Sequence, residues 1–403
     1  MKRIICLILV LLTVSAPLCG CLSPVSLDVY GYVISIGVDR GKDKRYYITF
    51  ALQREMQESN TQTEGGADIL ACEGDCLDEA KAELEGRVPY SLSFSRMNFF
   101  IFSEETARRG DMKDFLSITF DAEKIRTSAV AVISKGKAYE FIGGLSANND
   151  ANITKLQTAV MLDMEKNGMV TLMSVSRLFE AVETGVFDYC APMGRMDPEV
   201  ITDMEQKKAQ AEGKDPLEKV ETGDTVGGLK SDMDGTALFS GWIMTGELTR
   251  DETAYLNMAN GEFKNGTVSV PFDGSRDEGT VTVLLTMDKM KRSMISGARP
   301  SVVVNISLKA GVHKKPVGLG SDEMNEWIMT HIPGYIEERL AETFEKCREA
   351  GSDAMRFGTD AVKLMKSRRE YEAFDKKEFI NALEVSFKVE ITNTDKIMSG
   401  EHV

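Results

Sequence analysis

Histidine is scarce in this sequence. The only three are His313, His331 and His402, and histidine is the side chain that most readily serves as a general base near neutral pH or as a zinc ligand. His331 falls in a helix-like stretch just before Pro333, His313 precedes two lysines at a strand end, and His402 lies in the tail. We expect all three to be solvated surface residues rather than catalytic groups.

Motifs of familiar chemistry are also missing. There is no G-x-x-x-x-G-K-[ST], no strand-linked G-x-G-x-x-G, no H-E-x-x-H and no G-x-S-x-G, so no phosphate cradle or hydrolase elbow is recognisable. The acidic pairs Glu104-Glu105 and Glu337-Glu338 fall on predicted helices, where adjacent side chains diverge by about 100° and suit a solvated face. We therefore expect no catalytic residue, no cofactor and no metal ion.

Basic residues are too few for a nucleic-acid-binding surface, which must neutralise phosphates. The 403 residues include 48 Lys and Arg against 63 Asp and Glu, a formal charge of −15. DNA and RNA are therefore not expected as partners. A hydrophobic content of 42% with 28% charged residues predicts a globular protein, with length enough for two to three domains.

The sequence also lacks an apolar run of membrane-spanning length at its N-terminus. The run Ile4–Val14 has eleven residues, about 16 Å as a helix against a hydrocarbon core of about 30 Å. It is followed by Leu18-Cys19-Gly20-Cys21, which looks like a bacterial lipobox. We predict that residues 1–20 are a cleaved signal peptide and that Cys21 is lipidated. The alternative is an ordinary cleavage site beside which Cys21 is a bystander.

A lipid on Cys21 would matter because of the charge of the mature chain. Cleavage before Cys21 leaves 46 basic against 63 acidic residues, a net charge of −17, which an anionic membrane repels. A thioether-linked diacylglycerol carries two acyl chains, and two chains suffice for stable attachment. The lipid, rather than the protein surface as a whole, would hold the protein at the membrane.

Four further cysteines remain in the mature chain, Cys72, Cys76, Cys190 and Cys347. An even number in an extracytoplasmic compartment permits disulfides without identifying them. Cys72 and Cys76 are a candidate pair, provided that the turn between them is tight. A metal site there is not expected, because no second Cys or His pair completes four ligands.

The N-terminal part alternates predicted strands and helices. Val33–Val38 and Tyr46–Leu52 are β-rich runs joined by a polar turn and predict a hairpin. Further expected elements are a helix over 77–84, a strand over 98–102, a helix over 104–116, a strand over 129–133 and helical spacing over 153–182. A polar stretch then follows at 201–232, with thirteen charged residues and no aromatic one. It predicts a linker.

The last third shows the clearest periodicity. Apolar residues alternate with polar ones over 281–287, 302–308 and 383–391, the pattern of strands with one wet face, and we expect these strands to share one antiparallel sheet. A helical region over 322–374, interrupted at Pro333, Gly351 and Gly358, carries an apolar stripe that would cover that sheet: Ile336, Leu340, Phe344 and Cys347.

These patterns predict an α+β protein with several domains, three by this division, in which mixed or antiparallel sheets pack against helices. The expected division is an N-terminal α/β domain over 21–200, the charged linker over 201–232, a small β-rich middle domain over 233–267 and a C-terminal domain over 268–403. In the middle domain, 236–239 and 242–244 predict a hairpin, and Thr249 with Glu252 predicts a capping box.

Taken together, the lipobox and several segments resemble the Ger(x)C family, the lipoprotein C subunits of bacterial spore germinant receptors. The segments follow the order of that family over nearly the whole mature chain: Val33–Thr49, Ser93–Gly110, Ile125–Ala138, Gly235–Thr253 and Ser352–Gly358. The resemblance implies a non-enzymatic, three-domain lipoprotein on the outer face of the spore inner membrane. It also implies two membrane-embedded partners, the A-type and B-type receptor subunits.

A lipid-anchored extracytoplasmic solute-binding protein is the alternative function. Such a protein would have a deep cleft between domains, lined by aromatic and paired charged residues. Trp242 and Trp327 could line a pocket of this kind or belong to the core. An extracytoplasmic enzyme is the least favoured class, because it would need a catalytic site built without histidine.

Overall fold

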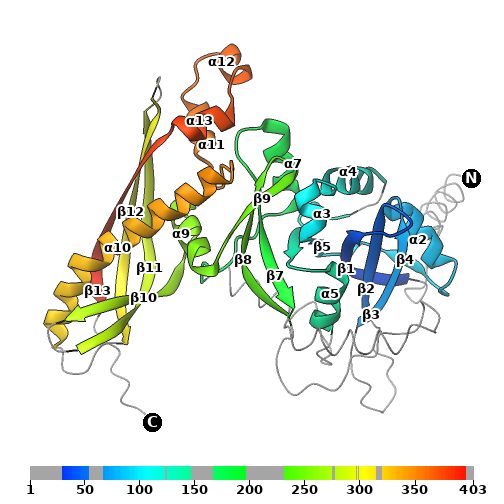
Figure 1. The fold of residues 1–403 in the computed structure, drawn as a ribbon, viewed down its shortest axis with the longest axis horizontal. Helices are drawn as coiled ribbons and strands as arrows, with labels where there is room; N and C mark the ends of the chain where they lie inside the picture. Colours follow the sequence, from blue (N-terminus) through cyan, green and yellow to red (C-terminus); the bar gives the residue numbers. More distant parts are fainter. Residues whose placement is uncertain are drawn as a thin grey trace, which may run out of the picture.

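The computed structural model describes residues 30–53, 67–122, 125–146, 167–196, 231–274, 277–295, 297, 299–314 and 320–395. In these ranges the chain forms two β-sheets with helices packed against them, placed end to end along an elongated molecule (Figure 1). The predicted α+β class with mixed sheets is confirmed.

The N-terminal sheet begins with the predicted hairpin. β1 (Tyr30–Arg40) and β2 (Tyr46–Gln53) pair antiparallel, and β3 (Ala67–Gly74) adds to the outer side of β2. The turn of the hairpin is held by the Glu73 carboxylate, which accepts hydrogen bonds of 2.7 to 2.9 Å from three successive backbone amides of residues 42–44. An acidic side chain of β3 therefore stabilises a turn whose amide donors would otherwise bond only to water.

Nine strands make up this sheet, in the order β3-β2-β1-β5-β6-β7-β8-β9, with β4 paired to β1. The strands after β3 are β4 (Ser91–Ser93), β5 (Phe99–Ser103), β6 (Val130–Ser134), β7 (Cys190–Met196), β8 (Ser231–Ser240) and β9 (Ile243–Leu248). β1, β5, β6 and β7 run parallel, whereas β8 and β9 are antiparallel to their neighbours. Strands on the two sides of the predicted linker therefore pair in one sheet, through β7 and β8.

Helices cover both faces of the nine-stranded sheet. α2 (Leu77–Glu85), α4 (Met112–Ala122) and α7 (Val175–Thr184) contribute to the larger hydrophobic cluster, and α5 (Ala138–Ser146) packs on the opposite face. The helix predicted over 104–116 is in fact two helices, because α3 (Glu104–Arg109) ends at Gly110, which has a φ of 75°. A left-handed residue ends a helix, and glycine adopts that conformation without strain.

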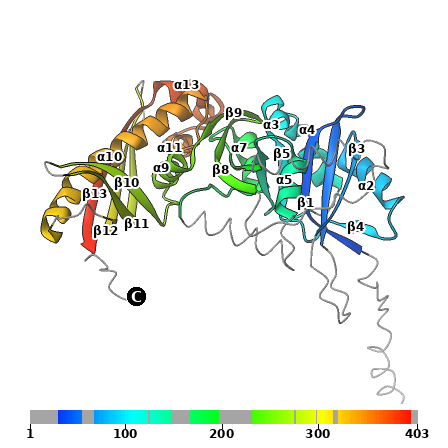
Figure 2. The ribbon, with the colours of Figure 1, turned by 60° about the horizontal axis from the view of Figure 1, so that its bottom comes forward.

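α9 (Arg250–Asn260) follows β9 and begins with the predicted capping box. The Thr249 hydroxyl accepts from the Glu252 amide, and the Glu252 carboxylate accepts from the Thr249 amide. α9 packs against β8 on one side and against the long helix α10 on the other. It thus lies between the two sheets (Figures 1 and 2).

The C-terminal sheet has four strands in the order β10-β11-β12-β13: β10 (Asn265–Gly274), β11 (Asp277–Ile295), β12 (Ser301–Lys314) and β13 (Glu384–Asp395). The first three are antiparallel, but β13 pairs with β12 in parallel. The prediction of one antiparallel sheet is therefore wrong for its last strand. The helices between β12 and β13 carry the chain back to the end of the sheet where β12 began, and such a return produces a parallel pair.

α10 (Ser321–Glu349) provides the predicted apolar stripe. Ile336, Leu340, Phe344 and Cys347 are all buried. The helix continues through Pro333, contrary to the expected interruption there. Ile332 and Ile336 on either side of the proline are fully buried, whereas Met329, four residues before the proline, is 54% exposed. The carbonyl that the missing proline N–H leaves unpaired can then turn toward water.

Three short helices follow α10. The chain breaks at Gly351, as predicted, and continues as α11 (Phe357–Lys363), α12 (Arg368–Glu372) and α13 (Lys376–Ala382) before entering β13. Gly358, expected to interrupt a helix, lies inside α11. One hydrophobic cluster extends without a break from the nine-stranded sheet through α9 and α10 to the four-stranded sheet.

Candidate functional site

A largely buried polar cluster, with Glu262 at its exposed rim, joins the two halves of the chain. We call it the junction and define it by six charged residues: Asp188, Glu262, Arg292, Asp353, Arg356 and Lys376. Asp188 lies just before β7 and is 1% exposed. Its carboxylate accepts hydrogen bonds from the amide of Gly241 at 2.9 Å and the amide of Asp353 at 2.8 Å, and it pairs with the ammonium of Lys376. A single side chain thus connects three separate segments.

Asp353 lies in the loop between α10 and α11 and is also 1% exposed. Its carboxylate accepts from the amides of Phe357 at 2.9 Å and Gly358 at 2.7 Å, so it satisfies donors in the first turn of α11. Burial raises the pKa of Asp353 to about 7, although these two hydrogen bonds act in the opposite direction. This carboxyl group therefore changes its charge near neutral pH.

The same loop contains a strained residue. Arg356 has a φ of 58° and a ψ of 33°, a left-handed conformation that is uncommon for residues other than glycine. Its guanidinium makes two hydrogen bonds to the carboxylate of Glu262, of 2.6 and 2.8 Å. A bidentate pair of this kind has fixed geometry. It therefore holds the loop against the segment that follows α9.

A second largely buried arginine completes the junction. Arg292 of β11 donates to the carbonyl of Ala259, to Asn260 Oδ1 at 2.9 Å and to Asp360 Oδ2 at 3.2 Å. Its guanidinium also lies 4.8 Å from the ring centre of Phe357. Burial lowers the pKa of Arg292, while Asp360 favours the charged form. The arginine thus ties the C-terminal sheet to α9 and α11.

The packing at the junction is close as well as polar. A Cβ atom placed on Gly358 would lie 1.9 Å from the carbonyl oxygen of Val186, a backbone atom that cannot rotate away. Only glycine permits this approach between α11 and the segment before β7. The two halves therefore meet with no room for an additional methyl group.

The sequence-predicted lipidation site, Cys21, lies outside the described residues, as do the signal peptide and most of the 201–232 linker. Lipidation of Cys21 thus stays a prediction. Cys72 and Cys76 are free thiols in the structure, and Cys72 Sγ donates to the carbonyl of Ala80 at 3.3 Å. The bridge between them also stays a prediction.

Cys190 and Cys347 are free thiols too, each 1% exposed. Burial raises the pKa of Cys190 to about 12, that of Cys72 to about 11, and that of Cys347 as well. Thiols with raised pKa values are protonated at neutral pH and react slowly as nucleophiles. As protonated thiols, the buried cysteines contribute to the packing of the core rather than to chemistry.

The other residues considered from the sequence take structural positions. Glu104 pairs with Arg108 of its own helix, and Glu337 Oε1 accepts from the Val389 amide on the edge of the four-stranded sheet. Trp242 packs edge-on against Phe179. The ring centre of Trp327 lies 5.3 Å from that of Phe272, in a tilted arrangement, and 4.9 Å from that of His331, on which it stacks. Within the described ranges, no group of three or more His, Cys, Asp or Glu is placed to bind a metal ion.

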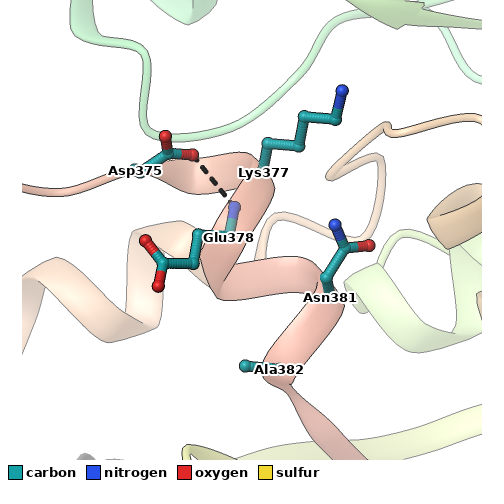
Figure 3. A pocket seen from close by; sticks show the side chains of 5 residues that line it. All are labelled: Asp375, Lys377, Glu378, Asn381 and Ala382. Atoms are coloured by element: carbon teal, nitrogen blue, oxygen red, sulfur yellow. Dashed lines mark hydrogen bonds between the residues drawn. The ribbon is translucent and has the colours of Figure 1, made fainter.

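An open pocket of about 510 Å³ lies along α13, lined by Asp375, Lys377, Glu378, Asn381 and Ala382. Figure 3 shows that these side chains spread away from the helix rather than converging on one point. Asp375 is occupied in capping its own helix, through a 2.9 Å hydrogen bond from the Glu378 amide. The pocket therefore has the shape of a surface hollow more than of an enclosed ligand site.

Sequence reasoning did not identify the junction. Asp188 and Asp353 have no spacing that marks them, because they lie 165 residues apart. The one available signal is the segment Ser352–Gly358, which belongs to the family resemblance and contains three junction contacts: Asp353, Arg356 and Gly358.

Comparison with known families decides what the chain is related to. Residues 24–196 match the model of the spore germination protein N-terminal domain, and residues 234–395 match that of the spore germination B3/GerAC-like C-terminal domain. The chain belongs to the GerAC family of spore germination proteins, the Ger(x)C germinant receptor C subunits. The predicted relationship is confirmed.

The fold agrees with this membership. The crystal structure of the GerBC protein superimposes with a TM-score of 0.51 at 13% sequence identity, covering 89% of this chain and 96% of that one. Comparison with curated proteins finds no match. Among the described residues, no helix combines the length and the apolar character needed to cross a membrane. In this Ger(x)C chain, the junction links residues of one family domain, such as Asp188, to residues of the other, such as Asp353.

Proposed function

We propose that this protein is a lipid-anchored subunit of a spore germinant receptor, required for germination triggered by nutrients. Cys21 carries the lipid and holds the chain on the outer face of the spore inner membrane. The protein works through contacts with the membrane-embedded A-type and B-type subunits and not through catalysis. The observation that carries this proposal is the match of both GerAC-family domains, which together extend over residues 24–196 and 234–395.

The junction supports a role that depends on the relative position of the two sheets. Asp188, Lys376 and Asp353 hold the nine-stranded and four-stranded sheets in one arrangement. A contact made at one end of the elongated molecule is then transmitted to the other end as a rigid displacement. Such coupling suits a subunit that bridges partners, and it does not require a chemical step.

In the part of the chain that the structure describes, the pocket on α13 does not have the geometry of a solute-binding site. A solute-binding site buries most of its ligand between convergent side chains, whereas the pocket on α13 is an open hollow with divergent side chains. A thermal-shift screen with amino acids and sugars separates the two functions, because a ligand that binds only the folded state raises the melting temperature. One strong hit would favour the solute-binding protein.

Germination of a deletion strain tests the proposal. Spores without the gene are challenged with a panel of nutrients, and dipicolinate release is measured. Calcium dipicolinate, which acts without a receptor, serves as the control trigger. Loss of the response to one nutrient class, with the control response intact, is the expected result. A normal response to every nutrient would contradict an essential role, and a deletion in a strain stripped of other receptors then tests for redundancy.

A further inference from the structure

Two separate segments project from the same end of the C-terminal half. One is the hairpin formed by β11 and β12, and the other is the group of short helices α11, α12 and α13. The Glu384 amide, directly after α13, donates to the carbonyl of Pro300 at the hairpin turn, and Ser301 pairs with both Ile295 and Glu384 in the sheet. Figure 1 shows α12 standing clear of the rest of the molecule at this end.

Both projections expose large apolar side chains. Ile295 of the hairpin is 69% exposed, the highest value among the exposed large hydrophobic residues of the described chain. Leu364, before α12, and Tyr371, within it, are 42% and 43% exposed. Apolar residues exposed singly are normal on a protein surface, so these three gain meaning only together with the charges beside them.

Basic side chains accompany these apolar ones. Arg299, Lys366 and Arg369 are exposed, and in the described structure their side chains form no ion pair. Residues 362–373 carry four basic and two acidic side chains, within a chain whose net charge is −15. This segment therefore has the opposite sign from the molecule as a whole. We call these six residues the tip: Ile295, Arg299, Leu364, Lys366, Arg369 and Tyr371.

We propose that the tip docks on an anionic lipid bilayer. Ile295, Leu364 and Tyr371 would enter the headgroup region, and the lysine and arginine side chains would contact lipid phosphates. This inference rests on the proposed membrane location and adds to it a second attachment point besides the lipid on Cys21. It would fix the orientation of an ectodomain that a lipid alone would leave free to rotate.

A bilayer fits the tip better than a protein partner does. Specific protein interfaces need about 800 Å² of continuous, complementary surface on each side. The apolar residues of the tip instead lie on separate projections, Ile295 on a hairpin, Leu364 just before α12 and Tyr371 within α12. A fluid headgroup layer can accept such separate projections without shape complementarity. Tyrosine is also enriched at the level of the headgroups.

Vesicle sedimentation of the unlipidated mature chain tests the proposal. The chain starts at Leu22 and so contains every residue that the structure describes. Binding to phosphatidylcholine vesicles is compared with binding to vesicles that are half phosphatidylglycerol, at low and at high salt. We expect binding to the anionic vesicles that weakens as salt is added, since exposed charges are screened.

Two variants of the tip separate its two contributions. Arg299→Glu with Lys366→Glu and Arg369→Glu should lower the partition coefficient on anionic vesicles about ten-fold or more. Replacing Ile295, Leu364 and Tyr371 by serine should lower it on both kinds of vesicle. The matched control combines Lys113→Glu, Lys264→Glu and Ile118→Ser, exposed residues elsewhere on the molecule, and should bind as the wild type does.

Two results would overturn the proposal: no binding of the wild type to anionic vesicles, or an equal loss in the control variant. If the wild type does not bind vesicles and the tip variants still impair germination in spores, the tip contacts a protein instead. Because the chain used here carries no lipid, a negative result leaves the Cys21 anchor and the receptor function unaffected. Those are tested separately, by lipid labelling and by dipicolinate release.

Discussion

Asp188 and Asp353 exchange hydrogen bonds across the junction. The Asp353 amide donates to Asp188 Oδ2 at 2.8 Å, and the Asp188 amide donates to the carbonyl of Asp353 at 3.3 Å. One residue belongs to the N-terminal family domain and the other to the C-terminal one. The relative position of the two sheets thus depends on buried polar contacts, which are costly to break because each leaves a group unsatisfied.

Gly358→Ala tests the close approach at the junction. In most helices a change from glycine to alanine raises the free energy of unfolding by up to about 1 kcal/mol. Here, however, the new Cβ would lie 1.9 Å from the Val186 carbonyl oxygen. We expect a loss of about 1–3 kcal/mol in the free energy of unfolding, measured in urea. Gly334→Ala is the control, because α10 leaves nothing within 4 Å of that position. The control should gain stability, and equal effects of the two changes would contradict the close packing.

The pKa of Asp353 predicts a dependence of stability on pH. Because its value of about 7 in the folded protein exceeds the ordinary 3.8, the folded chain keeps a proton that the unfolded chain has released. The free energy of unfolding should therefore fall as pH rises from about 4 to about 7, by up to about 1.4 kcal/mol per pH unit from this group.

Asp353→Asn, which cannot ionise, should flatten this dependence. Urea titrations at several pH values measure the slope for the wild type, for Asp353→Asn and for a control, the change of the exposed Asp43 to Asn. The control should keep the wild-type slope. An unchanged slope in Asp353→Asn would mean that other groups cause the pH dependence.

Lys376→Met removes the cation that pairs with the buried carboxylate of Asp188. The Lys376 side chain is 15% exposed and that of Asp188 is 1% exposed, so the change leaves a buried charge without its partner. We expect a loss of about 3 kcal/mol in the free energy of unfolding. Lys377→Met, at an exposed neighbouring position, should change it by less than about 0.5 kcal/mol. Combining Lys376→Met with Asp188→Asn should recover part of the loss, and strict additivity would argue against direct coupling.

Cys21→Ala tests the proposed anchor. The substitution should abolish incorporation of a radiolabelled or clickable fatty acid and move the protein from the membrane fraction to the soluble one. Cys6→Ala changes a cysteine inside the apolar run of the predicted signal peptide and should leave labelling intact. Labelling that survives in Cys21→Ala would show that the lipid, if present, is attached elsewhere.

Limited proteolysis tests the predicted linker. Residues 201–232 are rich in charge and contain no aromatic residue, so a protease should cut there first. Mass spectrometry of the earliest fragments locates the cut. Fragments that remain associated after cutting are expected, because β7 and β8 pair across this segment. First cuts confined to other segments would place the boundary elsewhere.

Local patterns determined much of the secondary structure. The hairpin of β1 and β2, the capping box at Thr249 and the buried stripe of α10 all follow from residues within a few positions of one another. The family relationship also came from short segments in their order along the chain. Such features depend on local propensity and periodicity, which a sequence displays directly.

Only the tertiary structure decided which distant segments meet. The parallel pairing of β13, the continuation of α10 through Pro333 and the addition of β8 to the N-terminal sheet all depend on packing between remote residues. The junction is the clearest case, since the burial that raises the pKa of Asp353 exists only when both halves are folded together. The sequence shows which residues carry a charge, but the surroundings of each residue in the folded protein determine its pKa and its partner.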